Sequence, residues 1–111
     1  MKEMVFTNQI YCENEEFLIN TIRRGIKWGS LEVGESVDLL NSNGISIARG
    51  IVNSVRIKPF LFLNNKDLEF NFEPECRSFI GVFKKMREFY KDFDVTEIIT
   101  SIDIELTYVG I

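Results

Sequence analysis

The segment at residues 23–32, RRGIKWGSLE, gathers side chains that could do chemistry on a small ligand. Lys27 and Ser30 lie three residues apart, and a lysine held in a poorly solvated cleft has its charged form disfavoured. Such a lysine acts as a general base toward a nearby hydroxyl, while a glutamate that faces both groups moves the proton or orients a water. The segment therefore offers a candidate catalytic set without histidine, a residue that the sequence lacks.

The same segment offers groups that could bind a ligand. Trp28 is the sole tryptophan, and a base stacked on an aromatic ring gains roughly 1 to 3 kcal/mol in single-strand binders. Arg23 and Arg24 could contact a phosphate. Purely structural interpretations remain open: the two arginines would complement the dipole at a helix end, and Trp28 would cover the core. Lys27 would then be solvated, and Ser30 would belong to a turn.

The elements that position this segment follow from hydrophobic patterning. Residues 4–11 alternate roughly between apolar and polar side chains, which predicts an opening strand. From Asn14 onward apolar residues recur at helical spacing, which predicts a helix that ends at Arg24. Gly25 would then take the left-handed conformation that closes a helix.

The central part of the chain is typical of a hairpin. Asn43 and Gly44 are a strong signal for a tight turn between antiparallel strands. Gly50, on the returning strand, indicates a β-bulge that would bend the sheet toward closure. Residues 58–75 are irregular, and we predict a short strand and a loop there.

Two regular elements complete the chain. Residues 77–90 have the spacing of a core-facing helix, with Ser78 or Pro74 near its start. Residues 101–109 alternate strictly, as a half-buried strand does. This order of elements predicts an α+β fold: a small mixed, mostly antiparallel β-barrel or sheet with two flanking helices.

Composition bounds the class of protein. The chain has 111 residues, 45% of them hydrophobic, which fits a single domain spanning residues 1–111. A net charge of −4 argues against binding long duplex DNA. No apolar run approaches the length of a membrane span, and Cys12 and Cys76 are too few for a disulfide scaffold. We therefore expect a cytoplasmic protein with no membrane association and no metal or other cofactor.

The order of these motifs resembles the ASCH domains, which belong to the PUA-like superfamily of small β-barrels. That family carries the signature G-x-K-x-x-[ST]-x-R. Gly25, Lys27 and Ser30 match it, and Glu32 stands at the place of the arginine. The resemblance spans about residues 14–108; residues 33–39, 84–90 and 101–106 are similar to the next strand, the end of the second helix and the closing strand.

The resemblance implies a domain that binds a nucleoside, a nucleotide or a short single-stranded RNA in a cleft beside Lys27. The alternative is an amidohydrolase that deacylates a modified nucleoside such as N4-acetylcytidine through Lys27, Ser30 and Glu75. Glu75 is the first choice for the glutamate, because it lies about as far before Tyr90 as the glutamate of the family lies before its tyrosine. Glu73 is the second choice. A third reading is a protein-interaction domain that has lost the pocket. Ligand binding ranks first; the expected ligand-binding residues are Arg23, Arg24, Trp28, Glu73 and Tyr90. The abundance of Ile, Asn and Phe suggests a bacterial or phage source.

Overall fold

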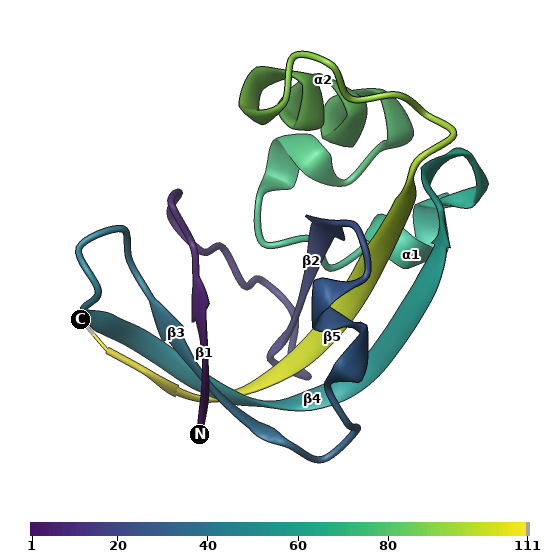
Figure 1. Ribbon diagram of the computed structural model, residues 1–111. Coiled ribbons are helices and arrows are strands. Elements are labelled where there is room, and N and C mark those ends of the chain that lie inside the picture. The colour runs from purple at the N-terminus through teal and green to yellow at the C-terminus, as the bar shows by residue number, and fades with distance from the viewer. Residues whose placement is uncertain (111) are drawn as a thin grey trace.

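The computed structural model describes residues 1–110 and contains a curved, five-stranded sheet with helical segments packed over one end (Figure 1). The strand order is β1-β3-β4-β5-β2, with β1 and β3 parallel and the other pairs antiparallel. The strands are β1 (Lys2–Val5), β2 (Leu18–Arg24), β3 (Ser36–Leu40), β4 (Ser46–Pro59) and β5 (Ile98–Val109).

This architecture confirms an α+β fold with a mixed, mostly antiparallel sheet and two helices. The sheet is not a closed barrel. β1 and β2 form its opposite edges, and within residues 1–110 they share no ladder of hydrogen bonds. The open side of the curved sheet is therefore free to accommodate the helices and the chain between β1 and β2.

The curvature comes from the long pair β4 and β5. Their register shifts between Arg49 and Gly50 and again between Val52 and Ser54, and each such bulge bends and twists a strand. A Cβ at Gly50 would lie 2.7 Å from the carbonyl oxygen of Glu105, so glycine lets the strands approach there. The predicted bulge at Gly50 is thus confirmed, as is the predicted turn, where Gly44 has φ +79°.

The predicted helix from Asn14 to Arg24 is wrong, because most of this segment forms β2. The Asn14 side chain accepts a hydrogen bond from the Leu18 amide (3.0 Å) and donates one to the Leu18 carbonyl (2.8 Å), which closes a short turn. Phe17 follows in the left-handed region, with φ 57°, a conformation that no α-helix contains. The free edge of β5 then pairs with residues 18–24 and satisfies their backbone groups.

The opening strand is shorter than the predicted residues 4–11. β1 ends at Val5, and the chain then leaves the sheet and crosses its open side before β2 begins (Figure 1). Two backbone hydrogen bonds hold this segment, from the Phe6 amide to the Leu40 carbonyl (2.8 Å) and from the Tyr11 amide to the Phe72 carbonyl (2.9 Å). It becomes a wall of the cavity described below.

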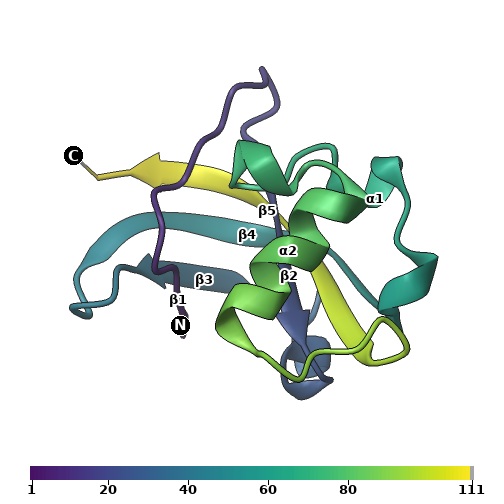
Figure 2. The same cartoon turned by 90° about the horizontal axis from the view of Figure 1, so that it is seen from above.

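The predicted helix near the C-terminal end is confirmed as α2 (Phe79–Phe89). Ser78 caps it, since its hydroxyl oxygen accepts a hydrogen bond from the Gly81 amide at 3.1 Å. Figure 2 shows α2 lying across the sheet near β2. Residues 58–75, where a short strand and a loop were predicted, contain only the end of β4 as strand and include the one-turn helix α1 (Asn65–Leu68). Three 3-10 turns complete the fold: η1 (Lys27–Ser30), η2 (Phe60–Phe62) and η3 (Pro74–Cys76).

Two apolar clusters make up the core. The first lies on the sheet and includes Met4, Phe6 and Ile104. The second joins α2 to the last residues of β4 and the first residues of β5, and it includes Phe60, Val82 and Met86. The two clusters meet beneath α2, where the cavity opens. None of the helices in residues 1–110 has the length and apolar character needed to cross a membrane.

Candidate ligand-binding site

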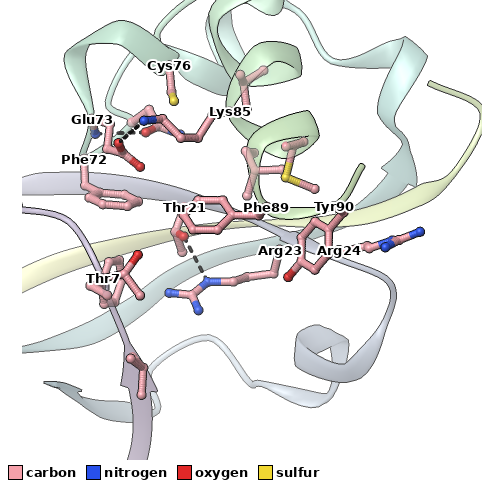
Figure 3. A pocket seen from close by; sticks show the side chains of 16 residues that line it. Thr7, Thr21, Arg23, Arg24, Phe72, Glu73, Cys76, Lys85, Phe89 and Tyr90 are labelled. Carbon is pink, nitrogen blue, oxygen red and sulfur yellow. Dashed lines mark hydrogen bonds and ion pairs between the residues drawn. The ribbon is translucent and has the colours of Figure 1, made fainter. Parts of the chain in front are cut away.

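A cavity of about 280 Å³ lies between the two core clusters, beneath α2 (Figure 3). Four segments line it: the chain after β1, the end of β2, the loop that leads into η3, and α2. Within β2, Thr21 and Arg23 both face the cavity, because alternate residues of a strand point to the same side.

Among the described residues, Arg23 is a cation without a counter-ion. Its Nε donates a hydrogen bond to the Thr21 hydroxyl at 3.0 Å, and its guanidinium carbon lies 4.7 Å from the centre of the Phe6 ring. Within residues 1–110 no carboxylate oxygen comes within 4.0 Å of its nitrogens. Burial lowers the pKa of Arg23 to about 10, so the side chain remains protonated at neutral pH. A desolvated, unpaired cation of this kind favours an anionic ligand.

Glu73 supplies a buried carboxylate to another side of the cavity. The residue is 6% exposed. Its Oε2 accepts a hydrogen bond from the Asn8 amide group at 3.1 Å and lies 3.4 Å from the Lys85 ammonium. Burial raises the pKa of Glu73, while the charge of Lys85 and the hydrogen bonds from Lys85 and Asn8 oppose that rise. The Glu73 amide donates to the Asn71 side chain at 3.0 Å, which fixes the loop.

Lys85 reaches the cavity from α2 and is clamped by carboxylates. Its ammonium lies 2.8 Å from Glu75, 3.3 Å from Glu88 and 3.4 Å from Glu73. The hydrogen bond to Glu75 is the largest cause of a raised pKa for Lys85. Lys85 is therefore a fixed positive charge and not a general base.

A glycine makes this arrangement possible. A Cβ at Gly81, in the first turn of α2, would overlap the carbonyl oxygen of Glu75. Glycine at this position lets η3 pack directly against α2. That close packing brings Glu73 and Glu75, on one segment, within reach of Lys85 on the other.

Aromatic rings surround the polar groups. Phe72 packs edge-on against Phe6, with ring centres 4.8 Å apart. Phe89 and Tyr90, at the end of α2, line the cavity and remain 53% and 40% exposed. Arg24 lies under the Tyr90 ring, with its guanidinium carbon 4.8 Å from the ring centre. These flat, partly exposed faces suit a flat ligand.

Arg24 differs from Arg23 because it has partners. Its Nε and a terminal nitrogen donate to the two oxygens of Glu97 at 2.7 and 3.1 Å, and another nitrogen lies 3.4 Å from Asp92. Arg24 therefore fastens the chain that follows α2 to the end of β2. It lines the cavity, but its charge is already neutralised.

The structure separates the residues predicted from the sequence into two groups. Arg23, Arg24, Glu73 and Tyr90 line the cavity. Lys27 and Ser30 are exposed on η1, and Trp28 packs partly buried against the first core cluster. Glu75 is exposed outside the cavity and contacts Lys85. The cavity therefore does not bring together the expected catalytic set of Lys27, Ser30 and Glu75.

Sequence reasoning missed Thr21 and Lys85. The last part of the family signature, [ST]-x-R, also fits Thr21-Ile22-Arg23, which line the cavity. In that alignment Leu18 stands at the place of the lysine. The alignment at Gly25–Ser30 matched more positions, and a helix over residues 14–24 would have turned Thr21 and Arg23 to different faces. A strand over residues 18–24 places Thr21 and Arg23 on the same face.

Two further features bear on the chemistry of the site. Burial raises the pKa of the Cys76 thiol to about 12, so this cavity residue is protonated and packs as a small apolar group. Within the described residues 1–110, no three Cys, Asp or Glu side chains are grouped in a way that would hold a metal ion.

Comparison with known proteins identifies the fold. No family model matches the sequence, and no match was found among curated proteins. The structure is similar to the ASCH domain of Lactobacillus crispatus, with a TM-score of 0.68 and 11% identity over 96% of this chain and 80% of that chain. It is also similar to an Enterococcus faecalis protein of the family DUF984, with a TM-score of 0.57 and 12% identity over 85% of this chain and 66% of that chain. The chain therefore has an ASCH-like fold, as the order of its motifs predicted.

Proposed function

We propose that the cavity binds a nucleotide, with Arg23 contacting the phosphate and the aromatic rings contacting the base. The observation that carries this proposal is the unpaired guanidinium of Arg23 in a cavity lined by Phe72, Phe89 and Tyr90. Arginine recognises phosphate through paired hydrogen bonds, and aromatic faces stack on bases of any sequence. The resemblance to the ASCH domains adds support, because the functions of that family are mostly related to nucleic acids or nucleotides.

The size and charge of the molecule favour a single nucleotide over a long strand. The cavity holds about 280 Å³, near the lower end of the roughly 300–1,000 Å³ of small-molecule sites. The net charge of −4 opposes a polyanion, whose binding depends on several lysines or arginines along one face. A nucleotide, or the end of a short single-stranded RNA, meets both constraints.

The arrangement supports binding more than the alternative of hydrolysis. Thr21 and Glu73 put a hydroxyl and a carboxylate in the cavity, which is the observation that favours an amidohydrolase. However, the amine in the cavity is Lys85, which three carboxylates hold protonated, and Lys27 lies outside. Incubation with N4-acetylcytidine tests this alternative: release of cytidine by the wild type but not by Glu73→Gln would make the protein a hydrolase. The third alternative, a protein-interaction domain that has lost the pocket, gains no support, because a cavity is present and contains the unpaired cation of Arg23.

Substitution of Arg23 tests the proposed function. Arg23→Gln is expected to weaken binding of AMP and CMP at least about tenfold, because a hydrogen bond to a charged group contributes about 1.5–3 kcal/mol. Isothermal titration calorimetry measures the affinity. Trp28 fluorescence is a second readout, since the Arg23 guanidinium carbon lies 6.0 Å from the centre of the Trp28 ring.

The control is Lys84→Gln, which makes the same change of charge at an exposed position of α2 outside the cavity. It is expected to leave the affinity within about twofold of the wild type, because exposed charges are screened by salt. Equal losses in the two variants, or no binding of any nucleotide to the wild type at millimolar concentration, would contradict the proposal.

A further inference from the structure

We propose that Glu73 determines which base the cavity accepts, by taking a hydrogen bond from the exocyclic amino group of cytosine or adenine. This inference rests on the proposed function, because it concerns the far end of the same nucleotide. Cytosine and adenine present an amino donor at a position where uracil and hypoxanthine present a carbonyl oxygen. Glu73 would therefore select amino-bearing bases over their oxo counterparts.

One oxygen of the Glu73 carboxylate receives no hydrogen bond from residues 1–110. The donors Asn8, at 3.1 Å, and Lys85, at 3.4 Å, both contact Oε2, and the Glu75 carboxyl group is a third neighbour of this side chain. No hydrogen-bond donor of residues 1–110 reaches Oε1. The side chain is only 8% exposed, and it lines the cavity. A carboxylate oxygen that has no donor and belongs to a side chain lining a cavity can accept a hydrogen bond from a ligand that supplies one.

Two neighbours of Glu73, Lys85 and Asn8, favour its acceptor form against burial and the nearby Glu75, which raise its pKa. An ionised carboxylate has acceptor sites only, whereas a protonated one also donates. Lys85 places its ammonium 3.4 Å from Oε2, and Asn8 donates to the same oxygen, so both partners favour the ionised form. Such a group attracts an amino hydrogen and repels the lone pairs of a carbonyl oxygen.

The positions of the other groups orient the ligand. Figure 3 shows the Glu73 carboxylate beside the Phe72 ring, with Arg23 at the opposite side of the cavity. A nucleotide whose phosphate meets the cation thus directs its base toward the carboxylate. The reverse orientation would place a phosphate against Glu73, and like charges in a poorly solvated cavity repel strongly.

Two pairs of nucleotides that differ at this one position test the inference. Calorimetric titration of the wild type is expected to give affinities at least about tenfold higher for CMP than for UMP, and for AMP than for IMP. In Glu73→Gln the carboxamide both donates and accepts, so the preference is expected to fall below about threefold. That substitution removes a buried charge, so thermal unfolding is measured as well to establish that the variant is folded. Glu73→Asp provides a second test, since its shorter side chain keeps the charge but moves the acceptor away from the base.

The matched control is Glu88→Gln. Glu88 also contacts Lys85, at 3.3 Å, but it is exposed and lies outside the cavity. This variant is expected to keep the preference for amino-bearing bases. The inference is overturned if the wild type binds all four nucleotides equally, or if Glu73→Gln keeps the full preference. In either case the proposed function stands when Arg23→Gln still weakens nucleotide binding at least about tenfold and Lys84→Gln does not. It fails when the two variants lose affinity equally or when no nucleotide binds to the wild type.

Discussion

Phe60→Ala is expected to lower the free energy of unfolding by about 3–5 kcal/mol, the usual range for removing a buried phenylalanine from a core. Phe60 is fully buried where β4 ends. Its ring centre lies 5.0 Å from those of Phe79 and Phe93 and 6.0 Å from that of Phe83. The ring thus joins the sheet to α2 and to the chain before β5. Its removal leaves a cavity that these rigid elements cannot close.

This loss is large compared with the total stability of a small domain, which is about 5–15 kcal/mol. Urea unfolding followed by circular dichroism measures it, and the melting temperature should fall by about 15 °C or more. Phe62→Ala is the control, because Phe62 lies in the same 3-10 turn but is 66% exposed. It is expected to change stability by less than about 1 kcal/mol. Similar losses in the two variants would contradict the role assigned to Phe60.

The consequence extends to the ligand site, because α2 forms one wall of the cavity. Lys85, Phe89 and Tyr90 all belong to α2 or follow it directly. In the Phe60→Ala variant, hydrogen exchange should accelerate first in the amides of α2, since its packing against the sheet is what has been weakened. A core substitution outside the cavity thus loosens the candidate site without changing a residue that lines it.

The elements that could be predicted from the sequence are those whose patterns are local and unambiguous. The apolar spacing of α2, the alternation of β5 and the Asn43-Gly44 turn are properties of short segments, and each predicted the correct structure. Residues 17–24 carry apolar side chains at spacings that fit both a helix and a strand. Their conformation is decided by the unpaired edge of β5, which lies about 80 residues further along the chain.

The same ambiguity explains what was missed in the site. Arg23 was predicted from its residue type, and Glu73 and Tyr90 from the resemblance to the ASCH domains; all three line the cavity. Thr21 joins Arg23 only because a strand turns alternate residues to one side, whereas in a helix they would lie on nearly opposite faces. In the sequence, Lys85 has the pattern of a solvated residue on the surface of a helix. Its contact with Glu73 follows from the close packing that Gly81 allows, and no sequence pattern shows this packing.

Asp67→Asn is the second substitution with a large expected effect, and its effect depends on pH. Asp67 is 7% exposed, and its Oδ2 accepts hydrogen bonds from the Lys58 ammonium at 2.7 Å and the Asn64 amide at 3.0 Å. Arg56 Nε lies 3.1 Å from Oδ1, an ion pair whose angle does not form a hydrogen bond. Burial alone would raise the pKa of Asp67, but the hydrogen bond from Lys58, that from Asn64 and the two positive charges outweigh it. The net pKa is lowered.

The direction of the pH effect follows from this lowered pKa. A carboxyl group with a lower pKa in the folded state than in the unfolded state stabilises the fold once it is ionised. The contribution of Asp67 is therefore fully present above the unfolded pKa of about 3.9. It is lost as the pH falls through the lower pKa of the folded state.

Asp67→Asn is expected to lower the free energy of unfolding by about 2–3 kcal/mol at pH 7, because it leaves Lys58 without a carboxylate partner and Arg56 with Asp103 alone. Urea unfolding at pH 7 and near pH 3 measures the difference from the wild type, which should shrink at the lower pH. Glu69→Gln is the control, since it removes an exposed charge two residues away and should change stability little at either pH. A loss from Asp67→Asn that is as large near pH 3 as at pH 7 would mean that the shape of the side chain, and not its charge, holds β4 to α1.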